Sequence, residues 1–375
     1  MGRLHCPRPG GKDLQRVTVS MDTQTYERRR EALRARLAAE GLEGFLVAHA
    51  ANRYYLTGFE LHDPQCNESA GLLLVTRDGE WLLTDGRYRD AALRLLPEEA
   101  VFIYGSPKVP QVRGFLKDKC PGALGFEDSA ISFRLHQDLS EGLMLRPCRN
   151  LVEDLRVVKD AVEIELVRRS CALNHAVFRR TESLLAEGRS EAEIAWDLEK
   201  LFRDKGAEGL AFPSIVAVDK NAALPHAIPG DTKVSDNCLV LVDMGCRLRG
   251  YCSDQTRTFW VGPRPTDHFL QAMERVREAQ DAAIAAIRPG ARARDAYLAA
   301  RAVFDKYGVA DRFTHGLGHG VGLETHEAPS AGAASEAVFA PGMVVTAEPG
   351  LYYPEWGGIR WEYMVLVTGD GCEVL

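Results

Sequence analysis

The C-terminal half of the chain contains a set of residues with the chemistry of metal ligands, each in a short segment rich in glycine or β-branched residues. These residues are Asp243, Asp254, His319, Glu348 and Glu362. Carboxylate oxygens prefer hard cations, and carboxylates joined by an imidazole suit a pair of divalent ions. The set therefore predicts a hydrolase that uses two metal ions.

The two aspartates lie in consecutive apolar segments. Asp243 comes near the end of a buried-strand pattern at 239–245, and Asp254 lies in the next apolar segment. Residues 247–250 can turn the chain between them, so antiparallel pairing would bring the two acids together. Two buried acids repel unless a positive charge lies between them. A divalent cation is one solution, and two acids that cap loops at strand ends are an equal alternative for this pair alone.

Three histidines fall within twelve residues, namely His315, His319 and His326, and glycines separate them. Glycine at this density lets the backbone pack close to a site, at an entropic cost. Histidines that serve only the core do not usually cluster in this way. The spacing of His315 and His319 resembles a zinc-binding helix, but the glycines argue against a helix here.

The two glutamates are predicted to lie on strands near the C-terminus. Glu348 ends a strand predicted at 344–348, and Glu362 lies inside an apolar strand predicted at 358–367. A glutamate within a buried strand costs free energy unless it has a partner. Arg360 is one candidate, since residues two apart share a strand face, and an ordinary surface pair is then the alternative for Glu362. Together with the other four residues, Glu362 favours a ligand.

The pattern of elements indicates an α/β (α+β) protein, and 375 residues favour two domains. Strands and helices alternate from a helix at 26–42 to residue 149, and Asp78-Gly79 predicts a hairpin between two of the strands. A charged amphipathic stretch with a break at Lys159-Asp160 marks the expected boundary. We expect a disordered leader at 1–21, an N-terminal domain at 22–150 and a catalytic domain at 151–375.

Composition excludes several classes of protein. The net charge is -7 and no Lys/Arg cluster occurs, so nucleic acid is not an expected partner. No apolar run reaches the roughly 18 residues that a membrane span needs. The nine cysteines are scattered without a CxxC pair. We therefore expect reduced thiols in a cytoplasmic protein, without a structural zinc site.

The ligand-type residues occur in the segments VLVDMG, YCSDQTRTF, HGLGHGVGLETHE, VVTAEPGLYY and GIRWE. In order and approximate spacing these resemble the motifs of the pita-bread metallopeptidases, in the branch of aminopeptidase P (Xaa-Pro aminopeptidase) and prolidase (Xaa-Pro dipeptidase). The stretch LAAEGLEGFLVAHAANRYYLTGF resembles the creatinase-type N-terminal domain of that branch. The resemblance spans about residue 21 to the C-terminus and implies such a domain followed by a pita-bread catalytic domain, in a homodimer.

The resemblance also implies the ligand set. Asp243 would bind one metal ion, His319 with Glu348 would bind the other, and Asp254 with Glu362 would bridge both. Glu348 would also act as general base. The oxygen-rich shell favours Mn(II) or Co(II) over Zn(II).

Further residues would contact the substrate, a proline-containing peptide. The segment AFPSIVAVDKNAALPHAIPG resembles the one that carries an additional active-site histidine, here His226. By resemblance His226, His315 and His326 would bind substrate and stabilise the reaction intermediate, so they are candidate catalytic residues. Arg360 and Tyr363 are candidate substrate contacts. Tyr363 stands where the family usually has an acid, a departure that concerns the shape of the substrate pocket.

The family hydrolyses the bond between an N-terminal residue and a following proline. Residues 84–88, TDGRY, resemble a segment of small bacterial aminopeptidases P, which favours longer peptides over dipeptides as substrates. A helix start capped by Asp85 is the alternative interpretation of that segment. A long loop at 60–69 would either be a variable surface loop or restrict substrate length. An Xaa-Pro dipeptidase is the alternative activity, and a non-catalytic pita-bread binding protein is a more remote one.

Overall fold

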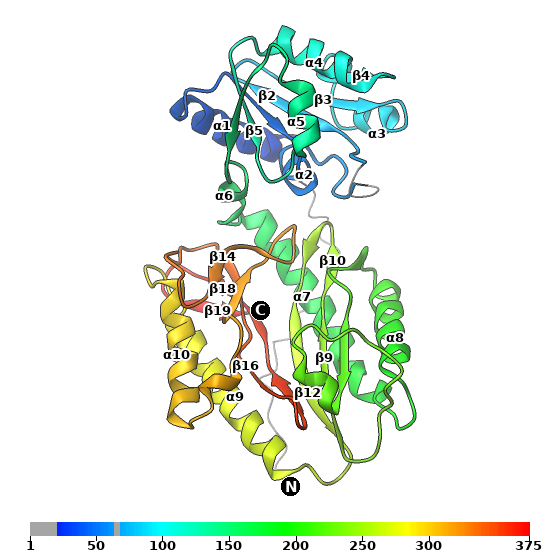
Figure 1. Ribbon diagram of the computed structural model, residues 1–375, viewed down its shortest axis with the longest axis vertical. Helices are drawn as coiled ribbons and strands as arrows, with labels where there is room; N and C mark the ends of the chain where they lie inside the picture. The colour runs from blue at the N-terminus through cyan, green and yellow to red at the C-terminus, as the bar shows by residue number, and fades with distance from the viewer. Residues whose placement is uncertain (1–20, 64–67) are drawn as a thin grey trace.

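The computed structural model describes residues 21–63 and 68–375. Residues 1–20 of the predicted leader and residues 64–67 of the predicted long loop lie outside the described residues. Figure 1 shows two parts stacked along the long axis, with the short helix α6 (Glu153–Arg156) between them. Among the described residues, no helix is long and apolar enough to cross a membrane.

The N-terminal part is built on a six-stranded mixed sheet in the order β4-β3-β2-β1-β5-β6. Its strands are β1 (Gly44–Val47), β2 (Leu72–Thr76), β3 (Glu80–Asp85), β4 (Val101–Tyr104), β5 (Ala123–Glu127) and β6 (Met144–Cys148). Its helices are α1 (Thr23–Ala39), α2 (Ala50–Thr57), α3 (Arg89–Leu93), α4 (Lys108–Lys119) and α5 (Phe133–Leu139), with a 3-10 turn η1 (Glu98–Ala100). The predicted boundary at 150/151 falls two residues after β6 and stays a prediction.

Local signals in this part behave largely as predicted. Helix α1 begins after Asp22, whose carboxylate accepts the Thr25 N–H at 2.8 Å, and the chain leaves the helix through Gly41 at φ +67°. Strands β2 and β3 form the predicted hairpin. The alternative interpretation of residues 84–88 as a helix start capped by Asp85 is wrong. Helix α3 starts later, after Tyr88, and the Asp85 carboxylate accepts from the backbone and guanidinium of Arg87 instead.

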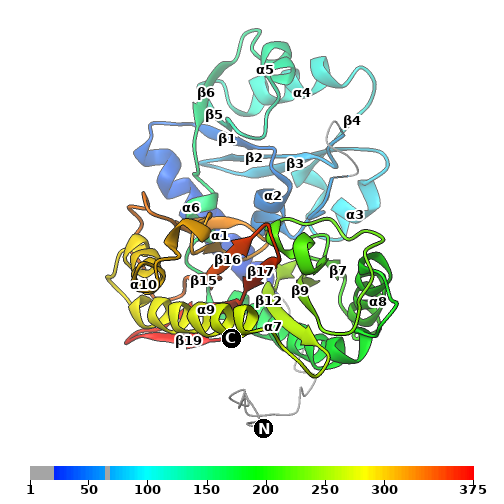
Figure 2. The same cartoon turned by 60° about the horizontal axis from the view of Figure 1, so that its bottom comes forward.

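The C-terminal part contains several small sheets between helices. Its strands are β7 (Gly209–Leu210), β8 (Ile215–Val218), β9 (Cys238–Met244), β10 (Cys246–Leu248), β11 (Tyr251–Cys252), β12 (Gln255–Val261), β13 (Gly318–Gly320), β14 (Glu327–Ala331), β15 (Val344–Ala347), β16 (Gly350–Tyr353), β17 (Gly357–Arg360), β18 (Tyr363–Val367) and β19 (Cys372–Val374). Its helices are α7 (Ala161–Thr181), α8 (Glu191–Asp204), α9 (Asp267–Ala286) and α10 (Ala293–Lys306), with 3-10 turns η2 (Glu182–Leu184), η3 (Asp219–Ala223) and η4 (Ala310–Arg312). In both views α8 and α10 lie on opposite flanks, with strands between them (Figure 1, Figure 2).

The sheets that matter for the site are β12-β9-β8 and β14-β13-β15-β18-β19. Strand β9 pairs antiparallel with β12, and Asp243 lies opposite Thr256. The turn predicted at 247–250 forms the tip of the β10-β11 hairpin, where Arg249 and Gly250 both have positive φ, as a mirror-image turn requires. Asp254 comes two residues before Thr256, so it lies diagonally across the ladder from Asp243 on the same face.

The strand predicted at 358–367 is interrupted. Strand β17 pairs with β16, whereas β18 pairs with β15 in a different sheet, so the chain changes sheets at Trp361 and Glu362. The backbone groups freed by this change are satisfied elsewhere: Glu362 N–H donates to Thr256 O at 3.1 Å, and Gln280 donates to Trp361 O at 2.9 Å. Glu362 therefore lies in a break between strands, and its placement inside one strand was wrong.

The two parts pack against each other through one shared apolar cluster and a set of ion pairs. Leu33 and Phe45 from the N-terminal part belong to the same buried cluster as Leu166, Tyr251 and Met364. Beside this cluster, helix α7 begins with a capping box in which Asp160 accepts the backbone N–H of Glu163. Arg29 of α1 reaches both carboxylates, at 3.1 Å from Asp160 and 3.3 Å from Glu163. The predicted break at Lys159-Asp160 is thus the start of α7, the first long helix of the C-terminal part.

We expect Asp160→Ala to lower the free energy of unfolding by about 1–2 kcal/mol, because it removes the cap of α7. Urea unfolding followed by circular dichroism measures this difference. Asp154→Ala is the control: Asp154 is half exposed and pairs with Arg36, and such pairs contribute little. Equal losses in the two variants would contradict the capping role.

Candidate metal centre

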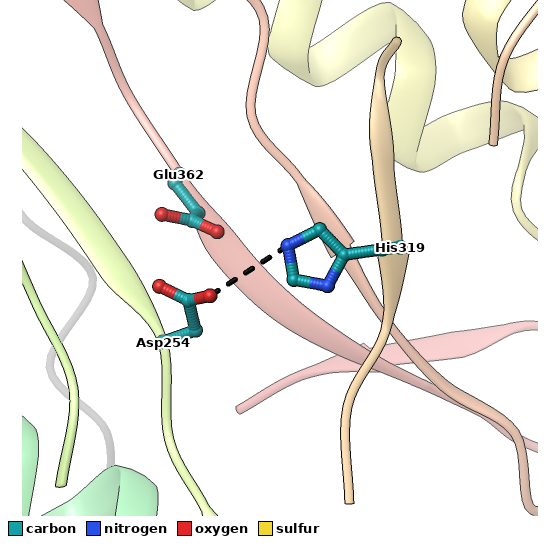
Figure 3. Close-up of side chains that lie close together, drawn as sticks. All are labelled: Asp254, His319 and Glu362. Carbon is teal, nitrogen blue, oxygen red and sulfur yellow. Dashed lines mark ion pairs between the residues drawn. The ribbon is translucent and has the colours of Figure 1, made fainter. Parts of the chain in front are cut away.

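Three side chains from three separate segments converge in the C-terminal part. Asp254 precedes β12, His319 lies on β13 and Glu362 lies between β17 and β18. Each offers a ligand atom within 4.8 Å of those of the other two, and Figure 3 shows the three side chains pointing toward one another. Asp254 is 4 % exposed and Glu362 is 1 % exposed, so both carboxylates are removed from water.

Glu348 joins this group through His319. It follows β15, and its Oε1 lies 3.3 Å from His319 Nε2. The hydroxyl of Thr346 donates to the same Oε1 at 3.1 Å and accepts the backbone N–H of His319, also at 3.1 Å. Thr346 therefore fixes the glutamate and the histidine relative to each other.

Asp243 is held at the other side of the group by Arg360. An Nη2–H of Arg360 donates to Asp243 Oδ2 at 2.7 Å, and the guanidinium is 3 % exposed. The alternative in which Arg360 forms a surface pair with Glu362 is wrong, because Arg360 is buried and bonds to Asp243. Glu362 instead accepts from the hydroxyl of Thr256 at 2.8 Å.

The charges of the group are not balanced by the protein. Burial and the neighbouring carboxylates raise the pKa of Asp254 and of Glu362 well above their usual values. Burial also raises the pKa of Asp243, although Arg360 opposes this. The charge of Arg360 therefore offsets only part of the repulsion and desolvation at these three carboxylates.

His319 is oriented as a ligand should be. Its Nδ1 lies 3.1 Å from Gly320 O, a bond that only a protonated nitrogen can donate. The Nε2 atom consequently faces Asp254 Oδ2 at 3.7 Å and Glu348 Oε1 at 3.3 Å. A lone pair directed at two carboxylates is stable only when a proton or a cation lies between them.

The residues present fit divalent cations. Asp243 Oδ1 is buried and has no hydrogen-bond partner, whereas its Oδ2 accepts from Arg360. A buried acceptor of this kind demands an explanation, and an ion that it ligates provides one. The donor set of carboxylates and one imidazole is also the set expected for Mn(II), Co(II) or Zn(II).

The sequence did not single out Tyr352, which connects two parts of the site. Its buried hydroxyl accepts from Arg360 Nη1 at 2.8 Å and lies 2.8 Å from His315 Nε2. Because His315 Nδ1 is 2.7 Å from Gly316 O, that nitrogen donates and Nε2 accepts from the tyrosine. Both ring nitrogens of His315 are thus used within the protein. The closeness of Tyr352 to Glu348 in the sequence was the feature that could have indicated its role in the site.

The other predicted histidines lie at the exposed edge of the group. The ring of His326 packs edge-on against His319, with centroids 4.2 Å apart. His226 is exposed. Burial lowers the pKa of His315 and of His326, and nearby charges, Arg360 for His315 and His319 for His326, lower it further, with a smaller contribution from His226 in each case. The ring of Tyr363 packs against the guanidinium of Arg257, 4.2 Å away, which favours a packing role over a substrate contact.

The glycines of the histidine segment allow close backbone approach. A Cβ at Gly318 would collide with the backbone of Thr346, and one at Gly320 with that of Ala328. These contacts arise where β13 pairs with β14 and β15. The segment contains the short strand β13 followed by a loop, and it is not a helix, as its glycines indicated.

Comparison with known families identifies the chain. Residues 165–369 match metallopeptidase family M24, and residues 29–158 match the creatinase/prolidase N-terminal domain. The first match covers more than half of the chain, and the chain belongs to metallopeptidase family M24. It combines the M24 domain with a creatinase-type N-terminal domain, as the resemblance implied.

Individual relatives carry both kinds of name. An "Xaa-Pro dipeptidase" of Pyrococcus furiosus is 34% identical over 79% of this chain and 87% of its own length. An Xaa-Pro dipeptidase structure from Bacillus anthracis has a TM-score of 0.87 at 32% identity, covering 93% of this chain and 97% of that one. An X-Pro aminopeptidase structure from Thermotoga maritima has a TM-score of 0.80 at 29% identity, covering 89% and 95%.

Metal binding should stabilise the fold, because cations would relieve the repulsion among the buried carboxylates. At a Mn(II) concentration of 100 Kd we expect about 2.7 kcal/mol of added stability over the protein in EDTA. Scanning calorimetry with and without the metal measures it. Glu362→Gln should lose most of the response, whereas the surface variant Glu373→Gln should keep it. An undiminished response in Glu362→Gln would remove Glu362 from the ligand set.

Proposed function

We propose that this protein hydrolyses the bond between an N-terminal residue and a following proline, acting as an Xaa-Pro aminopeptidase on short peptides. The observation that carries the proposal is the convergence of Asp254, His319 and Glu362 beside Asp243 and Glu348. Two divalent cations, Mn(II) before Co(II) or Zn(II), are the proposed cofactors. When bound, such ions supply the Lewis acidity that activates water and stabilises negative charge on the scissile carbonyl oxygen.

The protein's own groups divide the remaining work. Glu348 is the proposed general base, because Thr346 and His319 hold its Oε1 toward the centre of the group. Arg360 holds Asp243 by one oxygen and leaves Oδ1 available as a ligand atom. The hydroxyl of Thr256 similarly holds Glu362 by one oxygen, Oε2.

The exposed edge of the site suits the substrate. His226 and His326 are exposed, and the ring of His326 packs against His319, so both are available to donate hydrogen bonds to the peptide. We assign the binding of substrate and the stabilisation of the intermediate to these two histidines. His315, whose nitrogens bond to Gly316 and Tyr352, would bind substrate only by exchanging one of these partners.

Glu348→Ala tests this assignment. It removes both a ligand and the base, so kcat/KM for an Xaa-Pro peptide should fall by about 10²-fold to 10⁴-fold with an unchanged circular dichroism spectrum. Glu355→Ala is the matched control, since Glu355 is exposed and pairs only at 3.7 Å with Arg312. Near-wild-type turnover in Glu348→Ala refutes the assignment, and an inactive wild type with added Mn(II) favours a non-catalytic binding protein.

An Xaa-Pro dipeptidase is the second candidate. The observation in its favour is that the Pyrococcus furiosus and Bacillus anthracis relatives, at 34% and 32% identity, both carry that name. Residues 84–88, which favoured the aminopeptidase and longer peptides, give that candidate limited support, since Asp85 and Arg87 bond to each other at the surface.

A peptide-length series separates the two activities. We expect higher kcat/KM on Xaa-Pro-Xaa tripeptides than on the corresponding Xaa-Pro dipeptides, measured at saturating Mn(II). The matched Xaa-Ala peptides serve as controls for the proline requirement. A strong preference for the dipeptide would replace the first candidate by the second.

Two further proposals concern the setting of the enzyme. A homodimer follows from the family resemblance, and analytical ultracentrifugation of the purified protein tests it. A reducing, cytoplasmic setting is supported by the cysteines: in the described residues, Cys120, Cys148, Cys171, Cys238, Cys246, Cys252 and Cys372 are free thiols.

A further inference from the structure

A second buried charged cluster lies beneath the loop that carries His326. The loop joins β13 to β14 and is flanked by Glu324 on one side of the histidine and Glu327 on the other. Both glutamates reach Arg156, the last residue of α6, which is 2 % exposed. Helix α6 connects the two parts of the molecule, so this arginine stands at their junction (Figure 1).

Arg156 makes contacts in both directions. Its Nη2 donates to Glu324 Oε2 at 2.8 Å and also to Glu327 Oε1. Its Nη1 donates to Asn52 Oδ1 at 2.6 Å, and Asn52 belongs to α2 in the N-terminal part. One guanidinium therefore joins the N-terminal part to both ends of the His326 loop. A planar fork of donors suits this geometry, which an ammonium could not reproduce.

Glu327 fixes the shape of the loop. Its side chain is 6 % exposed, and it receives the Glu324 N–H at 3.1 Å and Lys159 Nζ at 3.0 Å in addition to Arg156. The carboxylate lies directly against the backbone, since a Cβ at Gly322 would be 2.5 Å from Glu327 Oε2. A loop pinned at this carboxylate has little freedom to move His326.

Glu324 extends the connection to the N-terminal part. Its Oε1 lies 3.2 Å from His49 Nε2, and His49 is the N-cap residue of α2. Both contacts from the N-terminal part, through Asn52 and through His49, thus come from the first turn of one helix and its cap. The position of α2 and the position of the loop are therefore set together.

We propose that Arg156 is a positioning residue, which sets the place of His326 at the edge of the metal centre by clamping Glu324 and Glu327 on either side of it. This inference rests on the proposed function only for the role of His326 in binding the peptide. The cluster has its own charge balance, in which Arg156 and Lys159 face the two glutamates, so it needs no ion. Its effect is to fix the conformation of the loop that carries His326.

A double-mutant cycle with Arg156→Gln and His326→Ala tests the proposal on the Mn(II)-loaded protein. Alone, Arg156→Gln should lower kcat/KM by about 10-fold to 100-fold, because small misplacements of substrate-binding groups cost that much. In the His326→Ala background the same change should lower kcat/KM by less than about 3-fold, since the group it positions is already absent. Equal losses in both backgrounds would show that Arg156 does not act through His326.

Controls separate positioning from stability. Arg168, on α7, forms a surface pair with Glu373. Arg168→Gln breaks this pair and should leave kcat/KM unchanged in either background. If Arg156→Gln does not fold, Glu324→Gln replaces it, because Glu324 is 37% exposed and loses only its charge. The same non-additivity with His326→Ala is expected, and full additivity would overturn the proposal.

A measurement independent of activity distinguishes failure of this inference from failure of the proposed function. The His326 ring signal in a ¹H–¹³C spectrum is assigned by its loss in His326→Ala. Arg156→Gln should shift this signal clearly more than Arg168→Gln does. An unmoved signal overturns the positioning role even in an active enzyme, and a moved signal supports it even if Xaa-Pro peptides are not cleaved.

Discussion

Burial of like charges around a small volume is the constraint on which the C-terminal part depends. Asp243, Asp254 and Glu362 are all less than a tenth exposed, and Glu348 lies beside them. Each carboxylate loses most of its hydration and gains a repulsive neighbour. Among the described residues, Arg360 is the permanent cation bonded to this group, at one edge of it. Bound divalent cations would supply further compensation.

The scaffold must hold these groups against their repulsion. Each comes from a different segment, and two of them are anchored by a neutral hydroxyl: Thr256 holds Glu362, and Thr346 holds Glu348. Strand pairing supplies the rigidity, because β9 with β12 and β15 with β18 are continuous ladders. The break between β17 and β18 lets Glu362 leave one sheet and reach the space between two.

The cluster around Arg156 and the group around Asp254 balance their charges in opposite ways. Around Arg156, two cationic side chains meet Glu324 and Glu327, and the pKa of both glutamates is lowered even though burial alone would raise it. Around Asp254, burial and the facing carboxylates raise the pKa of the Asp254 carboxyl well above its usual value. The balanced cluster joins structural elements, whereas the unbalanced cluster is suited to a metal centre. The short His326 loop lies between the two, so the rigid cluster around Arg156 supports this loop beside the candidate metal centre.

The sequence alone determined the residue types, their order and most element positions. The strands that carry Asp243 and precede Glu348 follow from apolar runs, and the glycines around His319 predicted close packing of the backbone and argued against a helix. It could not determine that Arg360 bonds to Asp243, which lies 117 positions away. Nor did it reveal Tyr352 as a link or the break at Glu362. Local propensity reports on neighbours along the chain, whereas these features depend on which sheets meet and which charges are buried together, and only the tertiary structure decides that.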